Sequence, residues 1–279
     1  MIRSWNEINY VEVPNGDIMD DPTNVFIIGT DPVMLIDTGS VVGMPVLLET
    51  LNTLGNPNVS TILLTHVHID HAESTEEIRR LTGASVRFHE AELPELAATT
   101  THDIPLDERI EDGEIIEHAG VRLEAVLTPG HAAGHLSFVE PAENWGIVGD
   151  LVTGSGSSAV FPPWGDLQDY LDSMQRIADR GINPLLPSHG DPVTNGPEAL
   201  QHFIRRRLQR EEQILELLDD QELSVEEVRD RLYENVPQDL LSDVTGNVIL
   251  HLEKLEREGR ITRSESGKES RFSRESLNR

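Results

Sequence analysis

Short apolar runs alternate with amphipathic stretches through the first 200 residues of the chain. Five of these runs are rich in valine, isoleucine and leucine, and each has the length of a short buried strand. Each run ends in an ionisable residue beside a small or turn-forming one; the segments read VMLIDTG, TILLTH, AVLTPGH, WGIVGD and NPLLPSHG. Strands that end together bring distant residues to one rim of a sheet. The pattern therefore predicts a mixed α/β domain with reactive groups at a sheet edge.

Helical periodicity occurs between these runs and dominates the end of the chain. Residues 74–81 and 166–180 are predicted helices, the second with apolar side chains at helical spacing. A long helix that begins just before residue 200 then leads into a different pattern. This change predicts one domain over residues 1–200 and a second over residues 201–279.

The second domain shows the signals of a winged helix, a variant of the helix-turn-helix module. Ser224 and Glu227 form a capping box that opens its second helix. A third helix is predicted over residues 242–258, where Gly259 stops it, and two short polar strands around SESGKES finish the domain. Three helices followed by a β-hairpin predict a winged-helix domain.

The 279 residues include no cysteine, which excludes disulfides and thiolate metal ligands. Any metal must therefore be held by imidazole and carboxylate groups. The first residues, MIRSWNEINY, lack the apolar core of a signal peptide, and no run of about 18 apolar residues occurs anywhere. We expect a cytoplasmic protein without a membrane partner.

The chain is strongly acidic, with 50 acidic residues against 22 basic ones, a net charge of −28, and only Lys254 and Lys268 as lysines. Such acidity can repel nucleic acid, or it can be a property of a whole proteome. We favour the second interpretation, because the scarcity of lysine resembles haloarchaeal proteins, whose surfaces are screened by high salt. The acidity is also uneven: residues 1–200 carry a net −24 and residues 201–279 a net −4, which supports the predicted boundary.

Four metal-binding side chains lie within six residues: His66, His68, Asp70 and His71. Histidines two apart in an extended segment can point their rings the same way. The aspartate and histidine that follow can face the same space where the chain turns. The alternative is a cluster of surface histidines, but four such groups in a buried setting are costly without a cation. We therefore interpret the cluster as a metal site.

The other strand ends supply further candidate ligands. His131 follows a Pro-Gly turn, Asp150 follows a glycine and could bridge two cations, and His189 lies between a serine and a glycine. In total, five imidazoles and two carboxylates suit two Zn²⁺ ions per chain, each with a position left open for water. Iron and manganese are the alternatives, because the same ligands accept them.

The motif THVHIDH, preceded by LIDTG and followed by TPGH, VGD and SHG, resembles the metallo-β-lactamase superfamily over roughly residues 8–200. The resemblance implies two ligand groups: His66, His68 and His131 for one metal, and Asp70, His71 and His189 for the other. It also implies that Asp150 bridges the metals, that Asp37 fixes the ligand loop from behind, and that His135 packs or forms hydrogen bonds. The implied fold is the αββα sandwich, in which two sheets pack face to face and the site lies at one edge.

Two departures narrow the branches of this superfamily. His68 stands where the di-iron flavoproteins have glutamate, and the true antibiotic-hydrolysing lactamases lack the bridging aspartate that Asp150 would be. Thioesterases of the hydroxyacylglutathione-hydrolase type, lactonases and RNA nucleases remain. The shared chemistry is attack by a hydroxide, since the two cations lower the pKa of bound water to about 7. Asp70 would orient this nucleophile and take up its proton.

The C-terminal domain bears on the choice of substrate. The segment LLSDVTGNVILHLEKLEREGRI resembles the winged-helix tail of a lactamase-like branch that includes mitochondrial endoribonucleases. Its basic side chains could contact phosphates. Alternatively, the domain is a packing or dimerisation module that shapes the substrate entrance, which is the interpretation we favour. The basic side chains are Arg257, Arg260, Arg263, Lys268, Arg271 and Arg274.

Three functions are compatible with these features. The leading hypothesis is a zinc-dependent hydrolase of a small-molecule ester or thioester. Cleavage of single-stranded RNA is the alternative, with RNA as the partner. The third is a winged-helix regulator that carries an inactive hydrolase domain, against which the complete ligand set argues. A homodimer is compatible with each of them.

Overall fold

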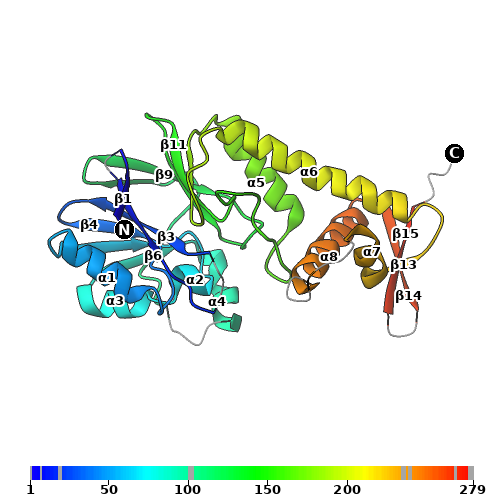
Figure 1. Ribbon diagram of the computed structural model, residues 1–279, viewed down its shortest axis with the longest axis horizontal. Coiled ribbons are helices and arrows are strands. Elements are labelled where there is room, and N and C mark those ends of the chain that lie inside the picture. The colour runs from blue at the N-terminus through cyan, green and yellow to red at the C-terminus, as the bar shows by residue number, and fades with distance from the viewer. Residues whose placement is uncertain are drawn as a thin grey trace.

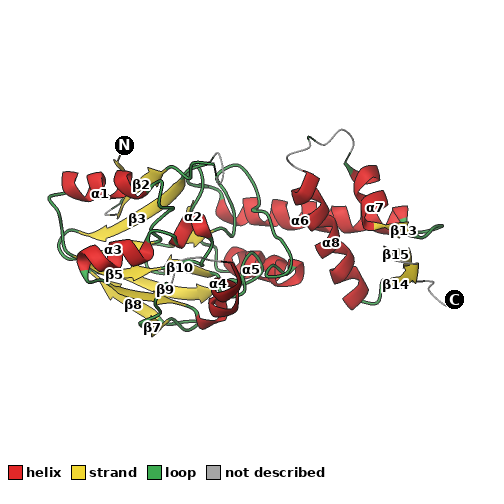
Figure 2. Ribbon diagram, turned by 90° about the horizontal axis from the view of Figure 1, so that it is seen from below, coloured by secondary structure: helices red, strands yellow, loops and turns green. Residues whose placement is uncertain are grey.

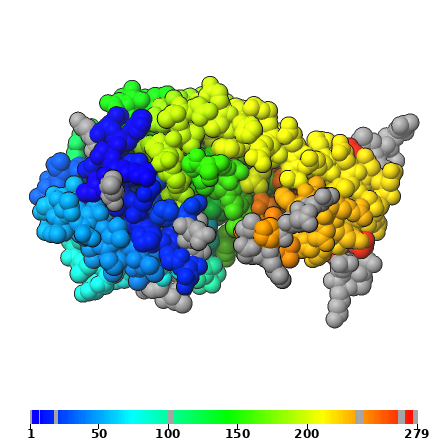
Figure 3. All heavy atoms as spheres, in the orientation of Figure 1, coloured from blue at the N-terminus to red at the C-terminus, as the bar shows by residue number. Residues whose placement is uncertain are grey.

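The structure, a computed structural model, describes residues 2–6, 8–17, 21–99, 104–233, 237, 241–266 and 269–275. Two β-sheets pack face to face in the N-terminal part, with helices on the outer faces (Figure 1). Helix α6, Gly196–Leu217, runs out from this sandwich to a smaller domain of helices and a three-stranded sheet (Figures 1 and 2; Figure 3 shows the same view in atoms). The arrangement is that of the predicted αββα sandwich followed by a winged helix.

The first sheet has seven strands in sequence order. Strands β1 to β4 pair antiparallel, and strands β4 to β7 pair parallel. Their bounds are β1 Ile2–Trp5, β2 Ile8–Val13, β3 Thr23–Gly29, β4 Val33–Ile36, β5 Val59–Leu63, β6 Ser85–Phe88 and β7 Glu108–Arg109. The parallel strands β4 and β5 end at the same edge of the sheet, where Asp37 and His66 follow them.

The second sheet has five strands in the order β12-β11-β10-β9-β8. Their bounds are β8 Ile115–His118, β9 Val121–Leu127, β10 Leu136–Glu140, β11 Trp145–Gly149 and β12 Leu185–Pro187. Strands β9 and β11 both run antiparallel to β10, and β12 runs parallel to β11. Strands β9, β11 and β12 therefore end at the same edge.

All five apolar runs singled out in the sequence are strands, but they divide between the two sheets. The runs at β4 and β5 belong to the first sheet, and those at β9, β11 and β12 belong to the second. The expectation that they share the rim of a single sheet is wrong. A local apolar run predicts a strand but not its pairing partners, which are distant in the sequence.

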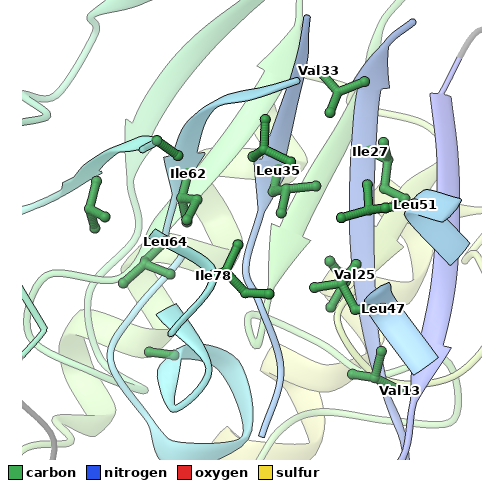
Figure 4. Close-up of a cluster of buried hydrophobic side chains, with 14 of the residues drawn as sticks. Val13, Val25, Ile27, Val33, Leu35, Leu47, Leu51, Ile62, Leu64 and Ile78 are labelled. Carbon is green, nitrogen blue, oxygen red and sulfur yellow. The ribbon is translucent and has the colours of Figure 1, made fainter. Parts of the chain in front are cut away.

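Strand β3 shows why the first sheet is apolar on both faces. Ile27 packs with the cluster that includes α1, Met44–Thr53, and α3, Thr75–Thr82, on the outer face (Figure 4). Its neighbour Phe26 points the other way and packs with Phe138 of the second sheet. A strand buried on both faces is nearly continuous in apolar residues, which is why this part of the chain lacks a polar alternation. The core therefore gives the ligand-bearing edge a rigid base.

The C-terminal domain contains the predicted winged-helix elements and one further strand. They are β13 Leu223–Ser224, α7 Val225–Leu232, α8 Leu241–Arg257, β14 Ile261–Ser266 and β15 Glu269–Arg274. Both hydrogen bonds of the capping box between Ser224 and Glu227 are present. Gly259 has a φ of 67° just after α8, as a helix-ending glycine requires. The short strand β13, which the sequence did not indicate, pairs with β15.

Helix α6 belongs to both halves of the molecule. Leu200 and Ile204 pack in the cluster of α5, Leu167–Asp179, while Ile214 and Leu218 pack in the core of the winged helix. The boundary near residue 200 falls inside this helix and stays a prediction. Within the described residues no helix is both long and apolar enough to cross a membrane.

Candidate metal centre

The strand ends of both sheets meet at one edge, and all seven predicted ligands lie there. The loop after β5 carries His66 and His68, and the short helix α2, Ile69–Ala72, carries Asp70 and His71. The second sheet contributes the remaining three from the ends of β9, β11 and β12: His131, Asp150 and His189. All but His68 are buried.

The first group consists of three imidazoles. His66 Nε2 lies 2.9 Å from His68 Nδ1, and His131 Nε2 lies 3.2 Å and 2.9 Å from these two atoms. Three ring nitrogens that converge in this way present their lone pairs to one point. Three imidazoles are a donor set that could hold a divalent metal ion.

The second group is formed by Asp70, His71 and His189. Asp70 Oδ2 lies 3.3 Å from His71 Nε2 and 3.2 Å from His189 Nε2. Asp150 lies between the two groups: its Oδ2 is 3.5 Å from His131 Nε2, and its Oδ1 is 3.4 Å from His189 Nε2. The two oxygens of one carboxylate therefore face different groups, which is the geometry that a bridging ligand needs.

Three atoms of this cluster are buried without a hydrogen-bond partner: His71 Nε2, His189 Nε2 and Asp150 Oδ1. A buried polar atom without a partner is destabilising. A divalent cation bound among these atoms would satisfy all three, and His71 and His189 each belong to a group whose candidate ligand atoms lie within 4.8 Å of one another. The unpartnered buried atoms and the convergence of the side chains therefore fit a metal centre.

The electrostatics of the cluster favour added positive charge. Burial lowers the pKa of His131 to about 4, which leaves its ring neutral and able to bind a cation. Burial opposes protonation of His189 as well, but the carboxylates of Asp150 and Asp70 raise its pKa to about 10. Two buried carboxylates thus stabilise a cationic group among them. A divalent metal ion meets the same demand and competes with protons for these nitrogens.

The far nitrogens of the rings are held by fixed acceptors. His71 Nδ1 lies 2.9 Å from Asp37 Oδ2, and Asp37 also accepts the backbone N–H of Thr65 at 2.8 Å. His131 Nδ1 contacts the carbonyl oxygen of Ala159 at 2.7 Å, and His189 Nδ1 contacts that of Pro22 at 3.0 Å. Such partners set the tautomer and the orientation of a metal-binding imidazole. Asp37 thus contacts both His71 and the backbone of the loop after β5, and its role behind the ligands stays a prediction.

Comparison with known proteins accounts for this arrangement. The sequence matches the metallo-beta-lactamase superfamily over residues 18–189, a span that includes every residue of the cluster. The chain belongs to the metallo-β-lactamase superfamily. A second match, to the beta-lactamase associated winged helix domain, covers residues 224–269. The αββα sandwich and the C-terminal winged helix predicted from the sequence are confirmed.

Two relatives illustrate how much of this chain aligns with other members of the superfamily. An atrochrysone carboxyl ACP thioesterase of Aspergillus fumigatus is 31% identical over 206 residues, which are 72% of this chain and 61% of the relative. A beta-lactamase-like protein 2 homolog of Drosophila melanogaster is 30% identical over 261 residues, which are 88% of this chain and 86% of the relative. The chain thus spans about three-fifths of the length of the fungal thioesterase.

Solved structures of superfamily proteins share the whole architecture. A metallo-beta-lactamase family protein from Thermus thermophilus superposes with a TM-score of 0.81 at 27% identity, covering 96% of this chain and 99% of that one. A beta-lactamase domain protein from Burkholderia ambifaria has a TM-score of 0.86 at 17% identity, covering 98% and 93%. The second likeness concerns the fold alone.

His135 packs beside His66 and His131, but both of its ring nitrogens are engaged outside the two candidate ligand groups. Its Nε2 accepts the backbone N–H of Asp150 at 2.9 Å, and its Nδ1 lies 2.9 Å from Thr128 Oγ1. Burial lowers the pKa of His135 to about 3. A neutral ring that holds the backbone of Asp150 agrees with the hydrogen-bonding role expected of it.

Two glutamates were missed in the sequence, and both contact the ligand loops of this superfamily site. They lie in the short segment formed by the 3₁₀ helix Glu90–Glu92 and by α4, Leu93–Thr99. The carboxylate of Glu92 accepts the N–H of Val67 at 2.9 Å and that of Gly134 at 2.5 Å, and thereby joins two ligand loops. Glu95 Oε1 lies 3.1 Å from His68 Nε2. Their burial is the signal, and it is visible only in the fold.

We expect the variant Glu95→Ala to bind the metal of the first group about 10- to 100-fold more weakly, the usual cost of losing the partner behind a metal-binding histidine. Glu95→Gln keeps an oxygen acceptor for His68 Nε2 and should lose less. Chelator competition measures both affinities. Glu90→Ala, which removes an exposed carboxylate paired with Arg109 at 2.8 Å, is the matched control. Wild-type affinity in Glu95→Ala would contradict the assignment.

Proposed function

We propose that the chain is a hydrolase with two metal ions, most simply Zn²⁺, that cleaves a small-molecule ester or thioester. The observation that carries the proposal is the position of Asp150 between two complete groups of ligands. The similarity to fungal proteins named thioesterases favours an acyl-thioester substrate. The imidazole and carboxylate donors also accept iron or manganese, so the metal depends on supply.

Asp70 is the proposed catalytic residue. When bound, the cations supply an acidified water and an electrophile for the carbonyl oxygen of the substrate. Burial opposes ionisation of Asp70, but His71 and His189 hold its pKa well below the usual range. The ionised carboxylate is therefore a hydrogen-bond acceptor that can orient a nucleophilic water.

Several of the exposed large apolar side chains belong to the segments that carry the site or contact it. Most large apolar residues of the described chain are buried, yet Ile69 between His68 and Asp70 is 43% exposed, and Val42 in the segment after Asp37 is 56% exposed. Others in the same segments are Val41, Leu93 and Phe161. Apolar surface beside a few convergent polar groups is typical of a small-molecule site and suits an apolar acyl chain.

The described part of the predicted basic face of the winged helix offers little unpaired positive charge to RNA. Arg257 pairs with Asp166 at 2.7 Å, and Arg271 pairs with Glu227 at 2.6 Å. The other described basic residues of this predicted face are similarly engaged: Arg260 with three glutamates, Arg274 with Asp219, and Arg263 with Ser270 and the ring of Phe272. Lys268 lies outside the described residues. Binding phosphates would require these pairs to break, which favours the packing interpretation.

The purified zinc-loaded protein is assayed with two kinds of substrate: acyl thioesters of increasing chain length and a labelled single-stranded RNA. The assay is run at high salt because we propose that the acidic chain is adapted to it. We expect thioester turnover that rises with the length of the acyl chain and is lost in His68→Ala. The matched control is His202→Ala, an exposed histidine on α6. RNA cleavage that vanishes in His68→Ala, with no thioester turnover, would favour the nuclease alternative instead.

A further inference from the structure

The segment of residues 157–166 lies between His131 and the winged helix and contacts both. On the side of the site, the carbonyl oxygen of Ala159 holds the ring of His131 through Nδ1 at 2.7 Å. The N–H of Asp166 donates to the carbonyl oxygen of Gly130 at 2.9 Å. The ring of His131 and the backbone just before it therefore both depend on this segment.

Arg207 of α6 holds the segment from the other side. Its Nη2 donates to the carbonyl oxygen of Ser158 at 2.9 Å, and its Nη1 donates to Asn247 Oδ1 of α8 at 2.5 Å. One guanidinium thus joins a winged-helix side chain to the residue directly before Ala159. A planar group with several fixed donors is suited to such a double contact.

Tyr170 contacts the same segment and lies next to Arg207. The guanidinium carbon of Arg207 is 5.8 Å from the centre of the tyrosine ring. The phenol Oη accepts the N–H of Ser158 at 3.0 Å and donates to the carbonyl oxygen of Leu151, next to Asp150, at 2.7 Å. The ring is fully buried, and burial raises the pKa of Tyr170 to about 12, so the donor keeps its proton. Tyr170 therefore ties the segment to the loop that carries Asp150.

A second contact reaches the same segment from α8. Arg257 forms an ion pair at 2.7 Å with Asp166, whose side chain also caps the first turn of α5. Gly246 of α8 approaches Phe161 so closely that a Cβ on this glycine would lie 2.9 Å from the aromatic ring. The winged helix thus packs against the segment on both sides of Ala159.

We infer that the C-terminal winged-helix domain is a positioning element of the metal centre, and that Arg207 is the residue through which it orients His131. The inference rests on the proposed metal site. The backbone before His131 packs tightly against α5, because a Cβ at Gly130 would lie 2.2 Å from the backbone nitrogen of Tyr170. A displacement of the segment is therefore transmitted to His131 and alters the geometry of the group that it forms with His66 and His68.

The experiment compares Arg207→Met, which keeps the apolar stem but loses every donor, with the wild-type chain. Zinc affinity of each site is measured by chelator competition, and the visible spectrum of the cobalt-substituted protein reports ligand geometry. We expect one of the two ions to bind about 10- to 100-fold more weakly with an altered cobalt spectrum, and the other to be unchanged. Arg207→Lys restores one donor and should recover part of the affinity.

The matched control is Arg210→Met on the same helix, whose guanidinium stacks 4.4 Å from the ring of Tyr233 within the winged helix. It removes an arginine from the domain without touching residues 157–166, so both affinities should stay at the wild-type level. Two wild-type affinities and an unchanged spectrum in Arg207→Met would overturn the inference. If Arg207→Met does not fold, Asn247→Ala removes only the partner of Nη1 and is judged by the same criteria. A wild-type chain that binds no metal would overturn the proposed function and this inference together.

Discussion

The variant Asp150→Ala is expected to retain clearly fewer than two tightly bound metals per chain and to lose nearly all turnover. The Asp150 carboxylate faces His131 with one oxygen and His189 with the other, so its removal takes a ligand from both groups. Removing one member of a buried set of charges costs about 3–5 kcal/mol. Metal binding should weaken by about 10²- to 10⁴-fold accordingly.

Metal analysis after gel filtration and steady-state kinetics measure the two effects. His189→Ala, which removes a ligand from the second group alone, should also hold clearly fewer than two metals. Asp230→Ala is the matched control, because it removes an exposed aspartate that pairs with Arg229 at 2.7 Å in the winged helix. Two tightly bound metals in both Asp150→Ala and His189→Ala would show that the ligand assignment is wrong.

Removal of the metals by a chelator is expected to lower the Tm by roughly 10 °C. A ligand present at a thousand times its Kd stabilises the folded state by about 4 kcal/mol. For a domain near 200 residues, each kcal/mol shifts the Tm by about 2–4 °C. The effect arises because Asp70 and Asp150 are buried next to each other, and their like charges are compensated less well without a divalent cation.

Thermal unfolding followed by circular dichroism, at one fixed salt concentration, measures the shift. The salt must be held constant because the net charge of −28 makes the folded state sensitive to screening. Re-addition of zinc should restore the Tm, and the chelator should have a smaller effect on Asp150→Ala. An unchanged Tm after complete loss of metal would mean that the cluster is equally stable without cations.

Much of the fold and most of the candidate site could be predicted from local patterns. The cluster of His66, His68, Asp70 and His71 is compressed into six residues, so its meaning needed no knowledge of the fold. Apolar runs and helix signals act over similarly short distances, which is why the five strands and the capping box at Ser224 were found. The clustering of His131, Asp150 and His189 followed from a shared pattern at strand ends.

What was missed depends on contacts between distant residues. Glu95 carries no motif, and its value as a partner of His68 arises only because α4 folds over the loop after β5. Several arginines of the predicted positive face pair with distant acids: Arg271 pairs with Glu227, 44 residues away, and Arg257 pairs with Asp166. A count of charges along the chain cannot show which of them meet.

The sequence by itself determined the candidate chemistry of this protein: which side chains are candidates to hold metal, five strands that carry or precede them, and the presence of a second domain. These properties depend on residue type and on spacing within a few turns or strands. The tertiary structure decided that the rims of two sheets, rather than one, form the site. It also decided that Arg207 connects the winged helix to His131. Both depend on hydrogen bonds and packing between residues far apart in the chain, which no local pattern encodes.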